Sequence, residues 1–76
     1  MKELKKATKY AARNLYKLRE SHGLTQQALA RMIGFSANSI SLWENRRAGM
    51  SLEAAIALAD FFGVSLDYLA GRDSMA

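Results

Sequence analysis

The side chains between residues 36 and 47 are suited to hydrogen bonding and anion binding rather than to covalent chemistry. This stretch combines amides and hydroxyls at helical spacing with two arginines: Asn38, Ser39, Ser41, Asn45, Arg46 and Arg47. Amides and hydroxyls can bond to the edges of nucleic-acid bases, and arginines bind phosphate through paired N–H groups. The chain has no cysteine and a single histidine, His22, which has no carboxylate or thiol pattern around it. We therefore expect no enzyme, no cofactor and no metal site.

Two short helical patterns meet at Gly34 within the segment 26–45. Gly34 can adopt the positive φ that the corner requires without a Cβ penalty. Thr25 and Ser36 stand where the two helices need N-caps, and the small Ala30 lies one turn before the corner. Apolar side chains recur where a shared core would need them, at Leu29, Ile33, Phe35, Ile40 and Trp43. The spacing predicts a helix-turn-helix whose second helix, from Ser36 to about Glu44, can enter a DNA major groove.

The segment resembles the helix-turn-helix of the phage-repressor and Cro-like family, also called XRE-type. The resemblance is carried by Ala30, Gly34, Ile40 and the run Trp43-Glu44-Asn45, and it continues through SLEAAIALADFFGVSLDYLAG, which is similar to that family's fourth and fifth helices. It covers about residues 14–72 and implies an all-α fold, a compact five-helix lambda-repressor-like DNA-binding domain. We expect one domain over residues 1–76, with the motif at about 26–45 and a basic N-terminal helix extension at about 1–13.

The remaining helices are predicted from periodicity and capping residues. An amphipathic first helix should begin near Leu4 and end before Gly23, and a fourth should follow Ser51 and end at Phe62. A last short helix, 66–70, follows Ser65. The fourth helix has two apolar faces, which predicts burial on two sides, and we expect Tyr68 to be exposed. Further apolar residues are assigned to the core: Met32, Leu66 and Leu69.

The candidate reading surface lies on the third helix. Ile40 and Trp43 share its inward face, which leaves five residues for base readout: Ala37, Asn38, Ser39, Ser41 and Leu42. An asparagine can pair with adenine, and alanine or leucine can contact thymine methyls, which predicts an A/T-leaning half-site. Many family members have a long polar or basic side chain at the positions of Ala37 and Leu42. The surface therefore reads DNA through methyl contacts and shape, or its direct readout is weak, or Leu42 serves a protein contact.

Phosphate contacts are expected around this surface. The start of the second helix offers free N–H groups, and the family resemblance assigns Gln26 to the DNA backbone. Two arginines follow the third helix, where family members often carry a proline after them; the alternative is that 45–49 is only a basic surface loop. The full set of candidates is Thr25, Gln26, Gln27, Ser36, Asn45, Arg46, Arg47, Arg13 and Lys17. The lysines from Lys2 to Lys9 form either a phosphate-facing stripe or a solvated face.

Arg19 has a structural rather than a DNA-facing role in this interpretation. It lies between the apolar and basic faces of the first helix, and in the resembled family its position pairs with the acid that matches Glu44. We expect a salt bridge between Arg19 and Glu44 that holds the first helix against the end of the third. The alternative is a pair of independent surface charges.

The overall charge agrees with a nucleic-acid partner. The net charge is +4, and up to Arg19 only Glu3 opposes the basic residues. No apolar run reaches the ~18 residues of a membrane span. We expect sequence-specific double-stranded DNA binding by a small prokaryotic or phage transcriptional regulator, a cytoplasmic, nucleoid-associated homodimeric repressor at a palindromic operator, with no membrane and no small-molecule substrate. The alternative is an antitoxin-like or other protein-interaction module on the same scaffold, with a protein partner.

Overall fold

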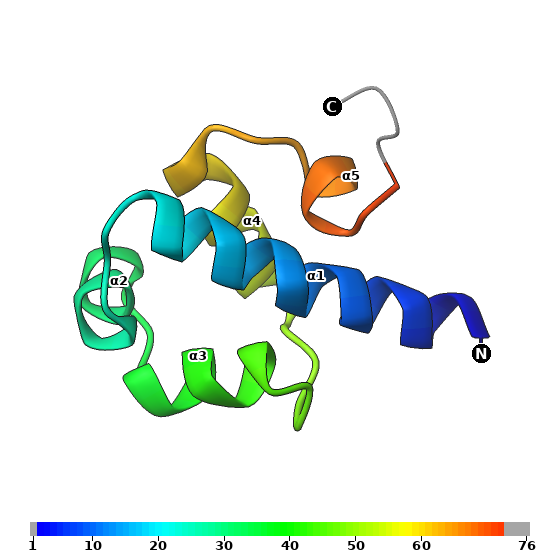
Figure 1. Cartoon of the computed structure of the whole chain (residues 1–76), viewed down its shortest axis with the longest axis horizontal. Helices are drawn as coiled ribbons and strands as arrows, with labels where there is room; N and C mark the ends of the chain where they lie inside the picture. The colour runs from blue at the N-terminus through cyan, green and yellow to red at the C-terminus, as the bar shows by residue number, and fades with distance from the viewer. Residues whose placement is uncertain (1, 73–76) are drawn as a thin grey trace.

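Five helices follow one another along the chain and surround a single core (Figure 1). The computed structural model describes the backbone of residues 2–72 and the side chains of residues 7–72. Its helices are α1 (Lys2–Ser21), α2 (Gln26–Ile33), α3 (Ala37–Glu44), α4 (Leu52–Phe62) and α5 (Leu66–Leu69). No strand occurs within residues 2–72, so the expected all-α class is confirmed. Expectations for residues 1 and 73–76, and for the side chains of Leu4 and of Lys2, Lys5 and Lys6, lie outside the described part.

Side-chain caps begin four of the helices at the residues that the sequence indicates. Each cap oxygen accepts a backbone N–H three residues later, at distances of 2.9 to 3.1 Å: Thr25 from Ala28, Ser36 from Ser39, Ser51 from Ala54 and Ser65 from Tyr68. Gly34 and Gly63 end α2 and α4 in the left-handed conformation, with φ of 78° and 70°. Local chemistry therefore sets most helix boundaries.

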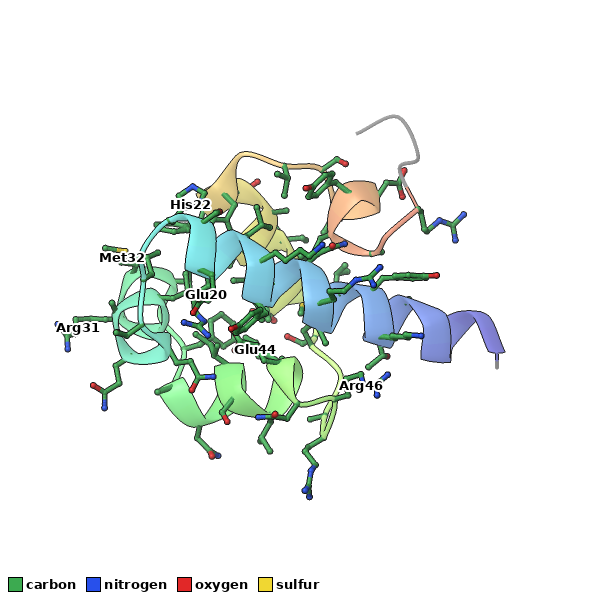
Figure 2. The ribbon with its side chains drawn as sticks, in the orientation of Figure 1. Glu20, His22, Arg31, Met32, Glu44 and Arg46 are labelled. Atoms are coloured by element: carbon green, nitrogen blue, oxygen red, sulfur yellow. The ribbon has the colours of Figure 1, made fainter. Side chains whose placement is uncertain are left out.

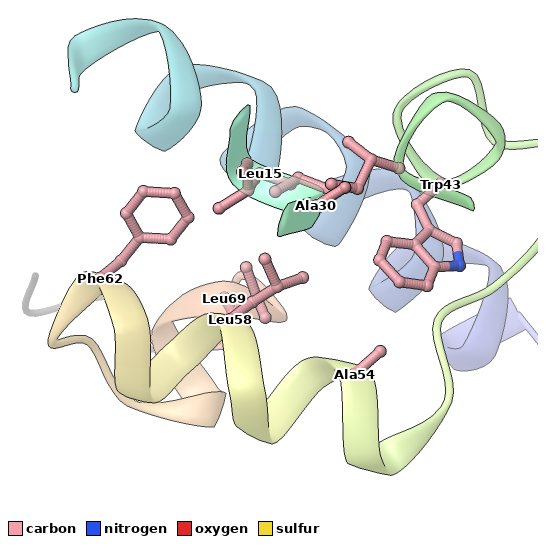
Figure 3. Close-up of a cluster of buried hydrophobic side chains, with 9 residues drawn as sticks. Leu15, Ala30, Trp43, Ala54, Leu58, Phe62 and Leu69 are labelled. Carbon is pink, nitrogen blue, oxygen red and sulfur yellow. The ribbon is translucent and has the colours of Figure 1, made fainter. Parts of the chain in front are cut away.

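Every helix contributes one large, fully buried side chain to the core. These five are Leu15, Leu29, Ile40, Leu58 and Leu69. Ala30 on α2 and Trp43 on α3 also belong to the buried core cluster, and Phe62 adds to it from the C-terminal end of α4 (Figure 3). Phe35 packs edge-on against Trp43, with ring centroids 5.5 Å apart. The orientation of α3 is thus determined by what its inner face buries.

Asn14 attaches the last helix to the first. Its Nδ2 donates to the carbonyl oxygens of Tyr68 and Leu69, at 3.0 and 3.1 Å. These carbonyls lie at the end of α5, where few backbone N–H groups remain to donate, although Tyr68 O also accepts the N–H of Gly71 at 3.0 Å. No sequence pattern indicates this contact, and Tyr68, which was expected to be exposed, is partly buried.

Three further expectations about burial are wrong. Neither predicted apolar face of α4 is buried throughout, since Leu52, Ile56 and Phe61 are exposed. The buried residues of this helix are Ala54, Leu58, Ala59 and Phe62. Met32 on α2 is 59% exposed and Leu66 on α5 is 42% exposed, although both were assigned to the core. Three exposed apolar side chains on α4 and α5 form what we call the apolar patch: Leu52, Ile56 and Leu66.

Replacing Gly34 with alanine should destabilise the fold because of its backbone conformation alone. A Cβ at Gly34 would meet no atom within 4 Å, yet its φ of +78° is one that L-residues adopt at a cost of about 1 to 2 kcal/mol. We expect Gly34→Ala to lower the free energy of unfolding by about that amount in urea denaturation. Gly49→Ala is the control, since a Cβ there meets only Thr8 Oγ1, at 4.0 Å, and no positive φ is required. Equal losses in both variants would contradict the argument.

Candidate nucleic-acid interface

The outer face of α3 presents a small mixed surface. Asn38 is exposed, Leu42 is 36% exposed, and Ala37, Ser39 and Ser41 are partly buried. Ala37 also packs against the core cluster, which limits what its methyl group can reach. Of the five residues expected to read bases, Asn38 and Leu42 are therefore the two that project furthest.

The hydroxyls near Asn38 already have partners inside the protein. Ser36 Oγ accepts the N–H of Ser39 and donates to Ser39 Oγ, each at 3.0 Å. Asn45 Nδ2 donates to the carbonyl oxygen of Ser41 at 2.8 Å and to its Oγ at 3.3 Å. Asn38 makes no side-chain hydrogen bond to another residue within 7–72, so its amide is the group ready to pair with a base edge.

A buried ion pair fixes α3 against α1. Arg19 Nε donates to Glu44 Oε2 at 2.7 Å and Arg19 Nη2 donates to Glu44 Oε1 at 3.0 Å, a paired geometry. The two side chains are only 9% and 6% exposed. Arg19 Nη1 also donates to the carbonyl oxygen of Leu24 at 2.8 Å. The hydrogen bond to Glu44 raises the pKa of Arg19 despite the opposing effect of burial, so the guanidinium stays charged.

Gln26 joins this ion pair. Its Nε2 donates to Glu44 Oε1 at 3.0 Å, which connects the start of α2 to the end of α3. The family resemblance assigns Gln26 to the DNA backbone, and no sequence pattern indicates this bond. One amide hydrogen and the backbone N–H groups at the start of α2 remain for a phosphate, beside the exposed Gln27. Thr25 Oγ1 is occupied by its cap.

The five remaining residues that were expected to bind phosphate divide into two groups. Asn45, Arg46 and Arg47 lie exposed in the loop after α3, while Arg13 and Lys17 lie exposed on α1. Arg13 and Arg46 line one shared cleft, and Lys17 does not line it. The guanidinium carbon of Arg13 lies 5.5 Å from the centroid of the Tyr10 ring, a cation–π contact.

Other site types find no support in the described part of the chain. No group of three or more potential metal-binding side chains occurs there. No helix among residues 2–72 has the length and hydropathy needed to span a membrane. His22 contacts Phe62 edge-on and lies 2.8 Å, through Nδ1, from the carbonyl oxygen of Leu18, which is a structural position.

Removal of Arg19 should be among the most damaging single changes to stability. Arg19→Ala would leave the Glu44 carboxylate buried without its cation, and we expect the free energy of unfolding to fall by about 3 to 5 kcal/mol. Arg72→Ala is the control, because the Arg72–Asp67 pair is separated by 3.9 Å with side chains 71% and 74% exposed, and its loss should cost under about 1 kcal/mol. Denaturation curves in urea would measure both, and matching midpoints would refute the structural role of the buried pair.

Comparisons with known proteins agree with this geometry. The Helix-turn-helix family model matches residues 15–69. The chain is similar to Antitoxin PezA of Streptococcus pneumoniae serotype 4, with 38% identity over 63 residues, which cover 83% of this chain and 40% of that protein. No solved structure gives a significant match. Because the family match extends over most of the five-helix fold, from the core of α1 to the end of α5, the chain belongs to the XRE-type helix-turn-helix family.

Proposed function

We propose that this protein is a small transcriptional regulator that binds double-stranded DNA in a sequence-specific manner and represses by occupying a palindromic operator. The observation that carries the proposal is the exposed Asn38 and Leu42 surface on a helix that a buried ion pair holds in place. Membership of a helix-turn-helix family supports it further. Such a protein would act in the cytoplasm, on the nucleoid.

The chemistry of α3 favours A/T-rich half-sites. The Asn38 amide can pair bidentately with N6 and N7 of adenine, and the Leu42 side chain can pack against thymine methyl groups. Helix α3 contains no arginine or lysine to hold guanine. Ser39 and Ser41 contribute less to readout, since their hydroxyls already bond within the protein.

Backbone anchoring would come from both sides of α3. The N–H groups at the start of α2, with Gln26 and Gln27, suit an anion because the helix dipole is positive there. Arg46 and Arg47 extend from the loop after α3, and Arg13 and Lys17 from α1. Cations placed this way position the protein on the duplex without reading its sequence.

A second copy of this chain is the proposed occupant of the apolar patch. Leu52 is 70% exposed and Ile56 and Leu66 are each 42% exposed, which is unusual for large apolar residues on neighbouring helices. A chain of this size gains little stability from its own core, so burial of the patch in a dimer would add to it. A twofold dimer would place two copies of α3 about 34 Å apart, as a palindrome requires.

The function is tested by selecting bound duplexes from a random pool at two salt concentrations. We expect an enriched A/T-leaning palindrome whose binding weakens as salt rises. Salt-sensitive binding without any enriched sequence would refute sequence-specific regulation.

Single substitutions separate base readout from backbone anchoring. Asn38→Ala should change preference at one base pair by about 1 to 3 kcal/mol, because it removes a bidentate contact. Arg47→Ala should weaken all duplexes similarly and reduce the salt slope by about one unit. Affinities for a panel of operator variants measure both effects. Uniform losses from both substitutions would contradict this division of roles.

Dimerisation is tested by placing a charge in the apolar patch. Leu52→Glu should convert the protein to a monomer in sedimentation equilibrium, since a carboxylate would be buried between two copies. Met32→Glu is the control, because Met32 is 59% exposed and lies on α2, outside the patch. A wild-type protein that sediments as a monomer up to its working concentration, free and on its operator, would disprove the dimer.

An antitoxin-like role is the second candidate function. The observation that favours it is the 38% identity to Antitoxin PezA. The chain spans 40% of that protein, so the matched part need not contain everything that an antitoxin uses. This role predicts that the protein is recovered with a stoichiometric protein partner, whereas a self-sufficient regulator is recovered alone and binds its operator unaided.

A further inference from the structure

An apolar pocket lies between α1, the loop that joins α3 to α4, and the adjoining parts of α4 and α5. Its volume is about 300 Å³. Figure 1 shows α5 on one side of α1 and the α3–α4 loop on the other, and Figure 2 shows Arg46 in that loop, beside α1. Four segments that are far apart in the sequence therefore surround the pocket, and no local sequence pattern indicates it.

Small residues leave this space open. Five of the residues that line it have a methyl group or no side chain at all: Ala7, Ala11, Gly49, Ala55 and Ala70. Leu69 also lines the pocket and is 2% exposed, so the floor of the pocket is the core itself. Leu52 and Leu66 line it too, and because both are exposed they lie at its mouth.

Helix α1 contacts the chain after α5 on one flank of the pocket. At about 100° per residue, Thr8 and Tyr10 lie on opposite sides of the α1 face that carries Ala7 and Ala11. A Cβ on Gly71 would lie 2.5 Å from the Cβ of Tyr10, whereas non-bonded carbon atoms normally stay about 3.5 to 4.0 Å apart. The backbone at Gly71 thus packs directly on α1, and this flank is closed.

The opposite flank is nearly closed as well. A Cβ on Gly49 would lie 4.0 Å from Thr8 Oγ1, so one added methyl group would bring the α3–α4 loop into contact with α1. A helix with its side chains is about 10 Å across and cannot enter between these walls. The pocket is therefore suited to a small molecule rather than to a segment of protein.

The lining favours an uncharged occupant. Among the described residues that line the pocket, none is charged, and the polar side chain is that of Thr8. An ion would lose hydration there without gaining a partner of opposite charge. Met50 adds a flexible thioether side chain, which adapts to the shape of what it contacts. An apolar cavity of roughly 150 Å³ holds one benzene molecule, so the pocket has room for about eight to ten carbon atoms.

We propose that this pocket binds one small, uncharged and mainly apolar molecule of about eight to ten carbon atoms. The site includes none of the residues assigned to DNA, so it stands whether or not the protein binds an operator. It shares Leu52 and Leu66 with the apolar patch, and a bound molecule would lie beside the surface proposed for a second copy. That link, unlike the site itself, rests on the proposed function.

The probe for the site is n-octanol, and two methionine methyl groups report on it. Met50 lines the pocket, whereas Met32 lies on α2 and is exposed outside it. In an NMR titration of the free protein, the Met50 methyl resonance should shift and saturate, with half-saturation at about 1 mM. The Met32 methyl resonance should stay in place. Parallel shifts of both resonances without saturation would show unspecific partitioning and overturn the proposal.

Octanoate tests the charge class of the ligand. It has the same chain length as n-octanol but carries a carboxylate, which the lining offers no cation to balance. We expect no saturable shift of the Met50 methyl resonance over the same concentration range. Equal binding of octanoate and n-octanol would contradict the assignment of an uncharged ligand.

Filling the pocket should abolish binding without unfolding the protein. Ala55→Leu places a larger side chain in open space, so the Tm should stay close to that of the wild type while the saturable response of Met50 is lost. Ala57→Leu is the matched control, because Ala57 lies on the same helix outside the lining. Ala70→Leu makes the same test from the end of α5 if Ala55→Leu folds poorly. Saturable binding that persists in a folded, filled variant would refute the site.

A second copy of the chain is the alternative occupant. If a partner protomer filled the pocket, the Met50 methyl resonance would shift with protein concentration, and n-octanol would have no effect on concentrated protein. This result would replace the small molecule with a second copy. Neither outcome bears on DNA recognition, which the selection of duplexes measures separately.

Discussion

The buried pair of Arg19 and Glu44 is the interaction on which the rest of the structure depends. Ion pairs with side chains less than 10% exposed lose most of their hydration, and they persist only where each charge finds several partners. Here the guanidinium bonds to Glu44 and to the carbonyl oxygen of Leu24, and the carboxylate also receives a bond from Gln26. Three helices therefore meet at one charge pair. The apolar core determines which faces turn inward, and this pair determines where the end of α3 lies relative to α1.

Much of the fold could be predicted from the sequence because its helix boundaries are determined locally. A hydroxyl at an N-cap or a glycine at a left-handed C-cap acts within one turn of chain, so Thr25, Ser36 and Gly34 identify helix ends without tertiary information. Burial is harder to predict, because it depends on which elements cover a face. Met32 on α2 and Leu52 and Ile56 on α4 are apolar but exposed. Periodicity indicates a face but does not show what covers it.

The candidate site was predictable in outline, and its internal bonding was not. The spacing of Ile40 and Trp43 leaves Asn38 and Leu42 on the outer face of α3, and this follows from helical geometry. The bond from Gln26 to Glu44 joins residues 18 positions apart, and no local pattern indicates it. The left-handed turn at Arg46 carries no glycine to signal it. Lys9 and Arg46 line one cleft because α1 packs against α3, which brings together residues far apart in the chain.

The two faces of α3 separate what the helix buries from what it displays. Ile40 and Trp43 belong to the core, whereas Asn38 and Leu42 have no part in the buried cluster. Substitutions at the displayed positions therefore remove no contact within the buried cluster. Such a helix can acquire new DNA preferences over evolutionary time with little effect on folding. A family that needs many specificities from one scaffold can draw them from a few residues, because the scaffold does not require particular side chains there.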